Sequence, residues 1–338
     1  MSAFVSTGSL PAPERVQELV DQAHARFRGV RDGAVSTVYP ALAAVAPEGF
    51  GVAVTGVTGA LYAAGDARTE FTIMSVAKPF VFALVCGALG PAQARLRVGA
   101  NATGLAFNSL AAVEAGPGGR TNPMVNSGAV ATAGLVPGRT LERRWQLVLD
   151  GLSRFAGRQL ALDPEVHRSA AATNHRNRAL AQLLHSLDAL DADPDETVEL
   201  YTRQSCVAVT AADLATMGAT LADGGVHPVT REQVVGQPVF RAVLSVMATA
   251  GLYETSGDWL YEVGLPGKSG IGGGMVTVSP GKGALGTFAP PLDAAGNSVR
   301  GRLTAEFLSR ELGLDLFASA PGPPRAAGPG RAAGSDRH

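Results

Sequence analysis

The segment 71–89 has the sequence FTIMSVAKPFVFALVCGAL and decides how the chain folds. Its second half is a continuous apolar run, which predicts a buried helix. We expect the helix to begin near Ser75 and to carry Pro79 in its first turn, where a missing backbone N–H is harmless. Lys78 then lies one turn from Ser75 on the same face, a spacing that suits a nucleophile and its base. On these four residues alone, a serine N-cap beside an exposed lysine is the better interpretation.

Lysine is rare in this chain: Lys78, Lys268 and Lys282 are the three lysines among 28 lysines and arginines. Arginine stays protonated, whereas a partly buried lysine can lose its proton and act as a base. The second lysine lies in the segment Lys268-Ser269-Gly270, on an expected strand before a glycine-rich turn. The edge of such a strand can donate a backbone N–H to an oxyanion. The two segments together favour a serine nucleophile with a lysine base.

Strand patterns occur near both ends of the chain, on either side of a long helical region. The expected strands cover 50–54, 61–64, 275–278 and 284–288, and the expected flanking helices cover 13–27 and 302–312. Helices expected in the middle of the chain include 141–155, 177–187 and 211–221. We therefore predict an α+β fold in which an antiparallel sheet is built from both chain ends, with a helical lobe inserted at about 86–245.

The composition is that of a single compact domain, which we assign to residues 1–317. Hydrophobic residues make up 46% of the chain and charged residues 17%, values typical of a globular protein. Residues 318–338 consist mainly of Ala, Gly, Pro and Arg with almost no apolar bulk. We expect this tail to be disordered.

Charge and apolar runs limit the classes of partner. The formal net charge is −1 and the arginines are scattered, so the basic stripe of a nucleic-acid-binding protein is missing. The longest apolar run, 80–89, is far shorter than the ~20 residues of a membrane span. The N-terminal sequence MSAFVSTGSL lacks the basic start and apolar core of a signal peptide. We expect a cytoplasmic protein that binds neither nucleic acid nor membranes.

The sequence also carries no cofactor signature. Its six histidines show no ligand spacing, and GIGGG followed by Met matches neither nucleotide-binding glycine pattern. We therefore expect no metal and no organic cofactor. Cys86 and Cys206 lie in apolar surroundings far apart in the sequence, which favours buried, reduced thiols.

Several longer segments resemble the bacterial and mitochondrial glutaminases. They are FTIMSVAKPF (71–80), TNPMVNSGAV (121–130), RNRALA (176–181), YTRQSCVAV (201–209) and GLYETSGDWLYEVGLPGKSGIGGGMVTVSPGKG (251–283), with the shorter pieces YPALA (39–43), FNS (107–109) and APPLDAAGNSVRG (289–301). The pieces occur in order over nearly the whole domain. The resemblance implies the fold of the serine β-lactamases and penicillin-binding proteins, and hydrolysis of L-glutamine to L-glutamate and ammonia. We also expect a homo-oligomer, either a dimer or a tetramer.

The resemblance assigns roles to individual residues. It implies that Ser75 is the nucleophile, that Lys78 is its base, and that Tyr253 lies close enough to relay a proton. Residues implied to bind the substrate are Ser75, Asn126, Asn177, Tyr201, Tyr253 and Ile271, where Ile271 and Ser75 supply backbone N–H groups to the oxyanion, and residues implied to support them are Lys268, Ser269 and Gly270. Taken singly, each asparagine is more simply a turn or helix-start residue, and each tyrosine a core residue.

Three positions depart from the family pattern. The family has Ser-Glu before RNRA, and that glutamate binds the substrate, whereas this chain has Ser169-Ala170. Glu165 lies about one and a half turns earlier, where helical geometry aims it elsewhere. The other departures are ANATG at 100–104 in place of a Glu-Pro-Ser-Gly segment, and the order Ser205-Cys206 in place of Cys-Ser. The departures alter the expected substrate contacts and leave the serine and lysine intact.

Other functions stay open on the sequence. The first alternative is an amidase that acts on a carboxamide other than glutamine. The second is a β-lactam or D-Ala peptide hydrolase, against which the missing signal peptide argues. The third is a binding protein that has lost catalytic activity. The missing glutamate at Ala170 supports this alternative, and the retained Ser75, Lys78 and Lys268 oppose it.

Overall fold

A five-stranded antiparallel sheet forms the centre of the molecule, in a computed structural model that describes residues 8–318. Its strands, in the order β2-β1-β8-β7-β6, are β1 (Gly51–Gly56), β2 (Leu61–Gly65), β6 (Gly267–Ser269), β7 (Gly274–Ser279) and β8 (Gly283–Phe288). Strand β1 pairs with β8, with Val52 opposite Thr287. The predicted sheet built from both chain ends is therefore confirmed, while the tail expected to be disordered lies, from residue 319, outside the described residues.

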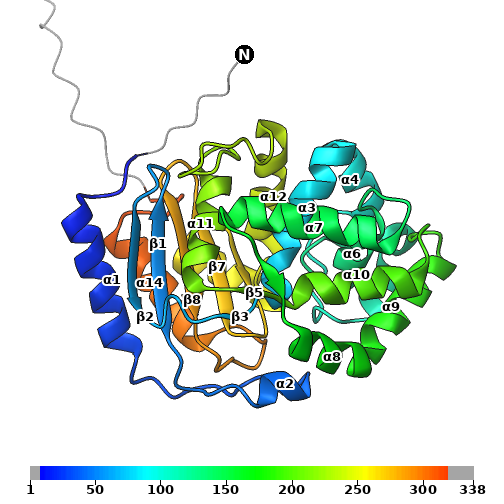
Figure 1. Cartoon of the computed structure of the whole chain (residues 1–338), viewed down its shortest axis with the longest axis horizontal. Helices are drawn as coiled ribbons and strands as arrows, with labels where there is room; N and C mark the ends of the chain where they lie inside the picture. The colour runs from blue at the N-terminus through cyan, green and yellow to red at the C-terminus, as the bar shows by residue number, and fades with distance from the viewer. Residues whose placement is uncertain (1–7, 319–338) are drawn as a thin grey trace, which may run out of the picture.

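The two faces of the sheet are covered by different helices because successive strand residues point to opposite sides. Val52 packs on the side of α1 (Pro13–Phe27) and α14 (Val299–Glu311), whereas Ala53 packs against α11 (Ala211–Ala222). Figure 1 shows the same three layers, with α1 and α14 on one side of the sheet and α11 on the other. Helix α1 has the bounds that the sequence predicts, and α14 begins three residues earlier than expected.

Helix α11 packs flat against the sheet, although its sequence lies inside the region expected to form the lobe. The contact is close because both surfaces are built from small residues. A Cβ atom on Gly286 of β8 would overlap the backbone of Ala211 and Ala215 in α11. The helical region 86–245 is thus interrupted by one helix that belongs to the sheet layers.

One large apolar core is formed by the other helices of the middle region, all of which except α8 supply residues to it, together with Leu214 and Met217 of α11. These other helices are α3 (Ala77–Leu89), α4 (Pro91–Val98), α5 (Ala111–Ala115), α6 (Asn126–Gly134), α7 (Leu141–Ala156), α8 (Pro164–Thr173), α9 (His175–Ser186), α10 (Pro194–Ser205) and α12 (Gln237–Ala250). Helix α7 buries Val148, Leu152 and Phe155, which share one face. The ring of Phe155 lies 5.1 Å from that of Phe80 in α3, so the helix predicted from the apolar run is central to this core.

A second, small sheet connects the lobe to the segment before Ser75. Its order is β3-β5-β4, with strands β3 (Phe71–Thr72), β4 (Ala161–Leu162) and β5 (Val207–Val209). The backbone N–H of Ile73 continues this pairing by donating to the carbonyl of Val207 at 2.9 Å. Strands of two or three residues are too short to show a period of two, so the sequence did not predict them. Strand β4 leads into the start of α8 and β5 follows the end of α10, so this sheet brings both helix ends next to the segment that carries Ser75.

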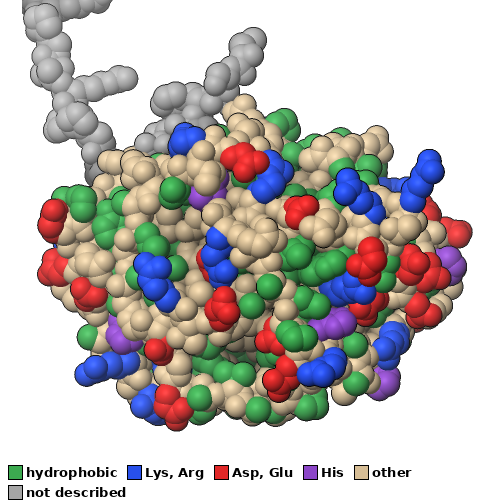
Figure 2. Space-filling view, viewed as in Figure 1, with side chains coloured by type: hydrophobic (Ala, Val, Ile, Leu, Met, Phe, Trp, Pro, Cys, Tyr) green, Lys and Arg blue, Asp and Glu red, His purple; other side chains and the backbone are tan. Residues whose placement is uncertain are grey.

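The remaining elements are short. They are α2 (Pro40–Ala43), α13 (Ser256–Val263) and the 3-10 turns η1 (Met74–Val76), η2 (Pro117–Gly119) and η3 (Tyr253–Thr255). Among the described residues, no single helix has the length and apolar composition of a membrane span, and only the bent pair Met74–Leu89 and Pro91–Val98 reaches them together, at an angle of 119°. On the face shown in Figure 2, basic and acidic side chains are intermixed and form no basic stripe.

Candidate active site

Ser75 and Lys78 lie side by side at the point where η1 passes into α3. Both are buried, with 9% of Ser75 and 2% of Lys78 exposed. The Lys78 ammonium group donates to the carbonyl oxygen of Met124 at 3.2 Å and to Oδ1 of Asn126 at 2.7 Å. Burial lowers the pKa of Lys78 to about 7. The alternative of an exposed lysine beside a serine cap is therefore wrong.

A chain of hydrogen-bonded side chains from the helical lobe forms one wall beside Lys78. Asn126, the first residue of α6, donates through Nδ2 to Asn177 of α9 at 3.0 Å and accepts from the Tyr201 hydroxyl of α10 at 3.2 Å. Asn177 in turn donates to Asn174, and Asn174 donates to Thr202 at 2.6 Å. The structure thus brings together Asn126, Asn177 and Tyr201, three residues that the sequence analysis assigned to substrate binding. Asn174 and Thr202 extend it, and the sequence analysis missed both.

Two tyrosine hydroxyls lie beside the Ser75 side chain. Burial raises the pKa of Tyr253 to about 12 and that of Tyr201 well above its usual value. Hydrogen bonding to Ser75 opposes the upward shift of the pKa at both tyrosines. Tyr253 has a φ of 60° and Met74, directly before Ser75, has a φ of 46°. Such left-handed conformations are rare for residues other than glycine and concentrate at functional sites.

The end of β6 forms the opposite wall, and it contacts Ser75 through backbone. A Cβ atom on Gly270 would lie 3.0 Å from the carbonyl oxygen of Ile73 and 3.2 Å from the backbone nitrogen of Ser75. Only a residue without a side chain allows this approach undisturbed. The next residue, Ile271, lies in the turn between β6 and β7, and N–H groups at the start of α3 have no intrahelical acceptor. Two N–H groups on facing segments suit the binding of an oxyanion.

Lys268 supports this wall from inside the sheet. It is fully buried, and its ammonium group donates to the carbonyl oxygen of Ser269 at 2.7 Å. The same carbonyl accepts the Tyr253 hydroxyl at 3.3 Å, and the Lys268 nitrogen lies 4.1 Å from the centre of the Tyr253 ring. Burial, and to a smaller extent the charge of Lys78, lowers the pKa of Lys268 well below its usual value. The pair Lys268 and Ser269 therefore fixes the tyrosine that faces Ser75.

The corner of the site at α8 is apolar. Ala170 is 1% exposed and belongs to a cluster with Leu42, Met74 and Cys206, against which Ile271 packs. Glu165, in the first turn of α8, is exposed to solvent. Tyr39 also packs against this cluster. The sequence analysis named it only as part of the YPALA segment that resembles the family. Cys206 is a free, buried thiol like Cys86, as expected, and burial raises the pKa of each to about 12.

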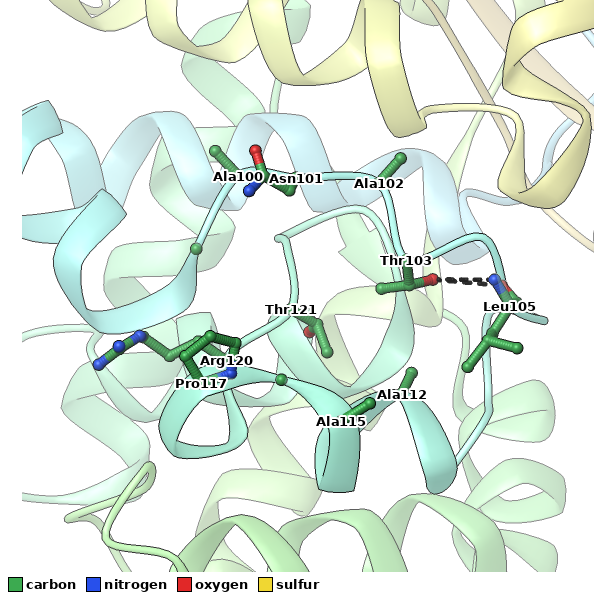
Figure 3. Close-up of a pocket in the computed structure, with 12 residues that line it drawn as sticks. Ala100, Asn101, Ala102, Thr103, Leu105, Ala112, Ala115, Pro117, Arg120 and Thr121 are labelled. Atoms are coloured by element: carbon green, nitrogen blue, oxygen red, sulfur yellow. Dashed lines mark hydrogen bonds between the residues drawn. The ribbon is translucent and has the colours of Figure 1, made fainter.

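A separate pocket lies next to the loop that follows α4. It has a volume of about 310 Å³ and is lined mainly by small residues, with Arg120 as the charged member. Figure 3 shows Ala112 and Ala115 of α5 facing the loop of residues 100–105 across this pocket. None of the residues predicted for the site lines it, so the chemistry is not located there. Within residues 8–318, no group of three or more His, Cys, Asp or Glu is placed to hold a metal ion.

Comparisons with known proteins agree with this geometry. The family model that matches is described as Glutaminase and covers residues 33–317. Glutaminase 2 of Yersinia pestis is 59% identical over 318 residues, which are 94% of this chain and 94% of that protein. A glutaminase of Brucella canis is 44% identical over 304 residues, which are 90% of this chain and 96% of that protein.

Solved structures give the same result. One described as "Probable glutaminase ybaS" matches with a TM-score of 0.90 and 41% identity, covering 91% of this chain and 100% of its own. The structure of Mglu in its glutamate form matches with a TM-score of 0.86 and 37% identity, covering 92% of this chain and 72% of its own. The predicted α+β fold, of the type shared with the serine β-lactamases, is confirmed by these matches. The chain belongs to the glutaminase family.

Proposed function

We propose that this chain hydrolyses the side-chain carboxamide of L-glutamine to L-glutamate and ammonia, with Ser75 as nucleophile and Lys78 as base. One observation carries the proposal: a buried lysine follows a buried serine at one helical turn, and burial lowers the pKa of the lysine to about 7. At neutral pH a large fraction of Lys78 is then neutral and able to accept a proton. The relatives compared above are named glutaminases, which supports glutamine as the substrate.

The reaction proceeds in two half-reactions. In the first, Oγ of Ser75 transfers its proton to Nζ of Lys78 and bonds to the amide carbon, and the N–H groups of Ser75 and Ile271 stabilise the oxyanion. The C–N bond then breaks, and ammonia leaves with a proton supplied by Lys78 or relayed by Tyr253. In the second, water attacks the acyl-enzyme while the same base takes its proton, which releases glutamate and regenerates Ser75.

The two tyrosines near Ser75 are poorer bases than Lys78. Burial raises the pKa of Tyr253 to about 12 and that of Tyr201 well above its usual value, so tyrosinate is scarce near pH 7. Neutral lysine is abundant at the same pH because the pKa of Lys78 is about 7. Tyr253 is therefore suited to donate or relay a proton.

A panel assay tests this function. Ammonia release is measured with glutamine, asparagine, a des-amino amide and a β-lactam, and intact-mass spectrometry after rapid acid quenching looks for an acylated Ser75. We expect ammonia from glutamine and a glutamyl adduct on Ser75. Release of ammonia from no amide in the panel excludes amidohydrolase activity, and hydrolysis of the β-lactam alone favours the other hydrolase.

Ala170 favours a second candidate substrate, a carboxamide without a free α-ammonium group. The family resemblance places a substrate-binding glutamate at this position, and this chain has none. The side chain of Ala170 instead belongs to an apolar cluster with Met74, next to Ser75 in the sequence, and Glu165 of the same helix is exposed. Position 170 therefore offers an ammonium group no carboxylate.

Restoring the acid separates the two substrates. Ala170→Glu is expected to raise kcat/KM for glutamine by up to about a hundredfold, the effect of one charged hydrogen bond, and to change the des-amino amide little. Ala170→Gln is the matched control, because it adds the same bulk without the charge and should give no gain. The second candidate would be rejected if Ala170→Glu leaves kcat/KM for glutamine unchanged and the wild type already prefers glutamine strongly. If neither the wild type nor Ala170→Glu cleaves glutamine but another amide is cleaved, glutamine is rejected as the substrate.

The homo-oligomeric state and the cytoplasmic location stay predictions. Light scattering coupled to size-exclusion chromatography measures the mass in solution, where a dimer or a tetramer is expected. Fractionation of the source cells measures the location, where the soluble cytoplasmic fraction is expected. A monomer, or recovery from another compartment, would contradict the respective prediction.

A further inference from the structure

Asn297 joins the two segments that hold Tyr253 in place. It lies between β8 and α14, is 2% exposed, and had no role in the sequence analysis beyond its place in APPLDAAGNSVRG. Its Oδ1 accepts the hydroxyl of Ser269 at the end of β6. Its Nδ2 donates to the hydroxyl of Thr255 at 3.0 Å, in the turn that begins with Tyr253. One side chain therefore connects the strand wall of the site with the tyrosine turn.

The tyrosine turn needs such support because its backbone is strained. A φ of 60° is unfavourable for a tyrosine and persists only where the surroundings enforce it. Hydroxyl groups enforce it from within the turn. Thr255 donates to the carbonyl of Leu252 at 2.8 Å, and Ser256 donates to the carbonyl of Tyr253 at 2.7 Å while it accepts the Leu252 N–H at 3.0 Å. Asn297 adds a second link between this turn and β6, beside the bond from the Tyr253 hydroxyl to the carbonyl of Ser269.

Asn297 is itself held rigidly. Oδ1 of Asp293 accepts the backbone N–H groups of Ala295 and Asn297, each at 2.9 Å, and the backbone N–H of Asp293 donates to the carbonyl of Asn297 at 2.8 Å. This closed turn aims the Asn297 side chain before any substrate arrives. A preorganised side chain holds its partners at little entropic cost.

We propose that Asn297 is a positioning residue that keeps the Tyr253 hydroxyl beside Ser75 by connecting Ser269 with Thr255. The inference rests on the proposed function, since it assigns Tyr253 a proton-relay role in that reaction. Loss of Asn297 leaves the Tyr253 hydroxyl and the Lys268 contact as the links between the tyrosine turn and β6, so that the left-handed conformation at Tyr253 relaxes and the hydroxyl moves away from the serine. A displacement of about 1 Å in a reacting group can cost about a hundredfold in rate.

The test compares Asn297→Ala with Ser298→Ala. Ser298 is the adjacent residue and is also buried, but its hydroxyl donates to Ala289 and caps α14, with no bond to the tyrosine turn. We expect Asn297→Ala to lower kcat for the amide that the wild type cleaves by about 10- to 100-fold and to change KM less than about threefold. Ser298→Ala should lower Tm and leave kcat within about twofold of the wild type. Equal losses of kcat in the two variants would overturn the proposal.

A double-mutant cycle separates positioning from general destabilisation. If Asn297 acts through Tyr253, adding Asn297→Ala to Tyr253→Phe costs no further kcat, whereas independent effects multiply. Should Asn297→Ala fail to fold, Thr255→Val removes the same bond from the other end, together with the bond from Thr255 to Leu252, and is expected to lower kcat at least as much.

A crystal structure of the variant that folds decides the question without an assay. Tyr253 leaving its left-handed conformation supports the inference, and Tyr253 unchanged in place contradicts it. A wild type that cleaves no amide defeats the proposed function alone, because the structural readout still stands.

Discussion

The two walls of the site are constructed by different means. The lobe wall consists of side chains that hydrogen-bond to each other, from Lys78 through Asn126 to Asn177. The strand wall consists mainly of backbone. It can lie close to Ser75 because Gly270 has no side chain. The lobe wall can therefore recognise polar groups of a substrate, whereas the strand wall can stabilise charge that develops on the reacting carbonyl. Apart from Lys78, changes on the lobe side should act mainly on KM, and changes on the strand side mainly on kcat.

The largest effect is expected at the junction of the two walls. Ser75→Ala removes the proposed nucleophile and should lower kcat by at least about a thousandfold, because no neighbouring group replaces it. The hydroxyl is small and lies at a helix start, so Tm should change by only about 2–4 °C, a shift of about 1 kcal/mol in the free energy of unfolding. Steady-state kinetics and thermal unfolding measure the two. A variant that retains more than a few per cent of activity removes Ser75 from the mechanism.

The next largest effect concerns Lys78, the proposed base on the lobe side. Lys78→Arg keeps the charge but does not accept a proton, so it should be nearly as inactive as Lys78→Met. In the wild type, kcat/KM should rise as the pH increases through about 7 and level off above it, since neutral lysine is the active form. Steady-state rates between pH 5 and 9 test this. An active arginine variant, or a rate that falls over the same range, would give Lys78 an electrostatic role only.

A substitution in the strand wall should lower kcat with little change in KM. Gly270→Ala introduces a Cβ atom 3.2 Å from the Ser75 nitrogen, which pushes the oxyanion donors apart and should cost about 10- to 100-fold in kcat. Gly87→Ala is the control, because Gly87 lies in α3 with no atom within 4 Å of its added Cβ. This control should retain full activity and gain about 0.5–1 kcal/mol of stability. A change in KM alone for Gly270→Ala would contradict the division between the walls.

The smallest effect is expected in the lobe wall. Asn177→Ala leaves the Nδ2 group of Asn126 and the Oδ1 of Asn174 without a partner, and it removes a polar group from the substrate side. We expect KM to rise by about tenfold, which corresponds to about 1.4 kcal/mol, and kcat to fall less than about threefold. Full kinetic curves for glutamine separate the two constants. A fall in kcat at constant KM would show that the lobe wall also acts in the transition state.

Local patterns account for the parts of the molecule that the sequence predicted. Helix α1 and the hairpin of β7 and β8 follow from apolar periodicity, which each element shows by itself. The serine–lysine helix follows from one unbroken apolar run. The asparagines of the lobe wall were named only through family resemblance, because nothing in their own segments specifies a partner about 50 residues away.

The parts that the sequence did not predict depend on tertiary contacts. Strands β3, β4 and β5 have two or three residues each and exist because their partners are brought to them. Helix α11 has an ordinary helical pattern, which says nothing about whether it covers a sheet or joins a lobe. The bond from Asn297 to Thr255 spans 42 residues and is set by packing around both. Such links are visible only once the chain is folded.

The sheet has a consequence for how the protein is made. Ser75 and Lys78 leave the ribosome long before β6, β7 and β8 have been translated, and β1 has no partner on its β8 side until Phe288 has emerged. Pairing across so large a sequence separation is a slow step of folding. An incomplete chain therefore holds the serine and the lysine without the strand that faces them. Under the mechanism proposed above, a truncated translation product releases no ammonia, and amide hydrolysis begins only when the last strand has joined the first.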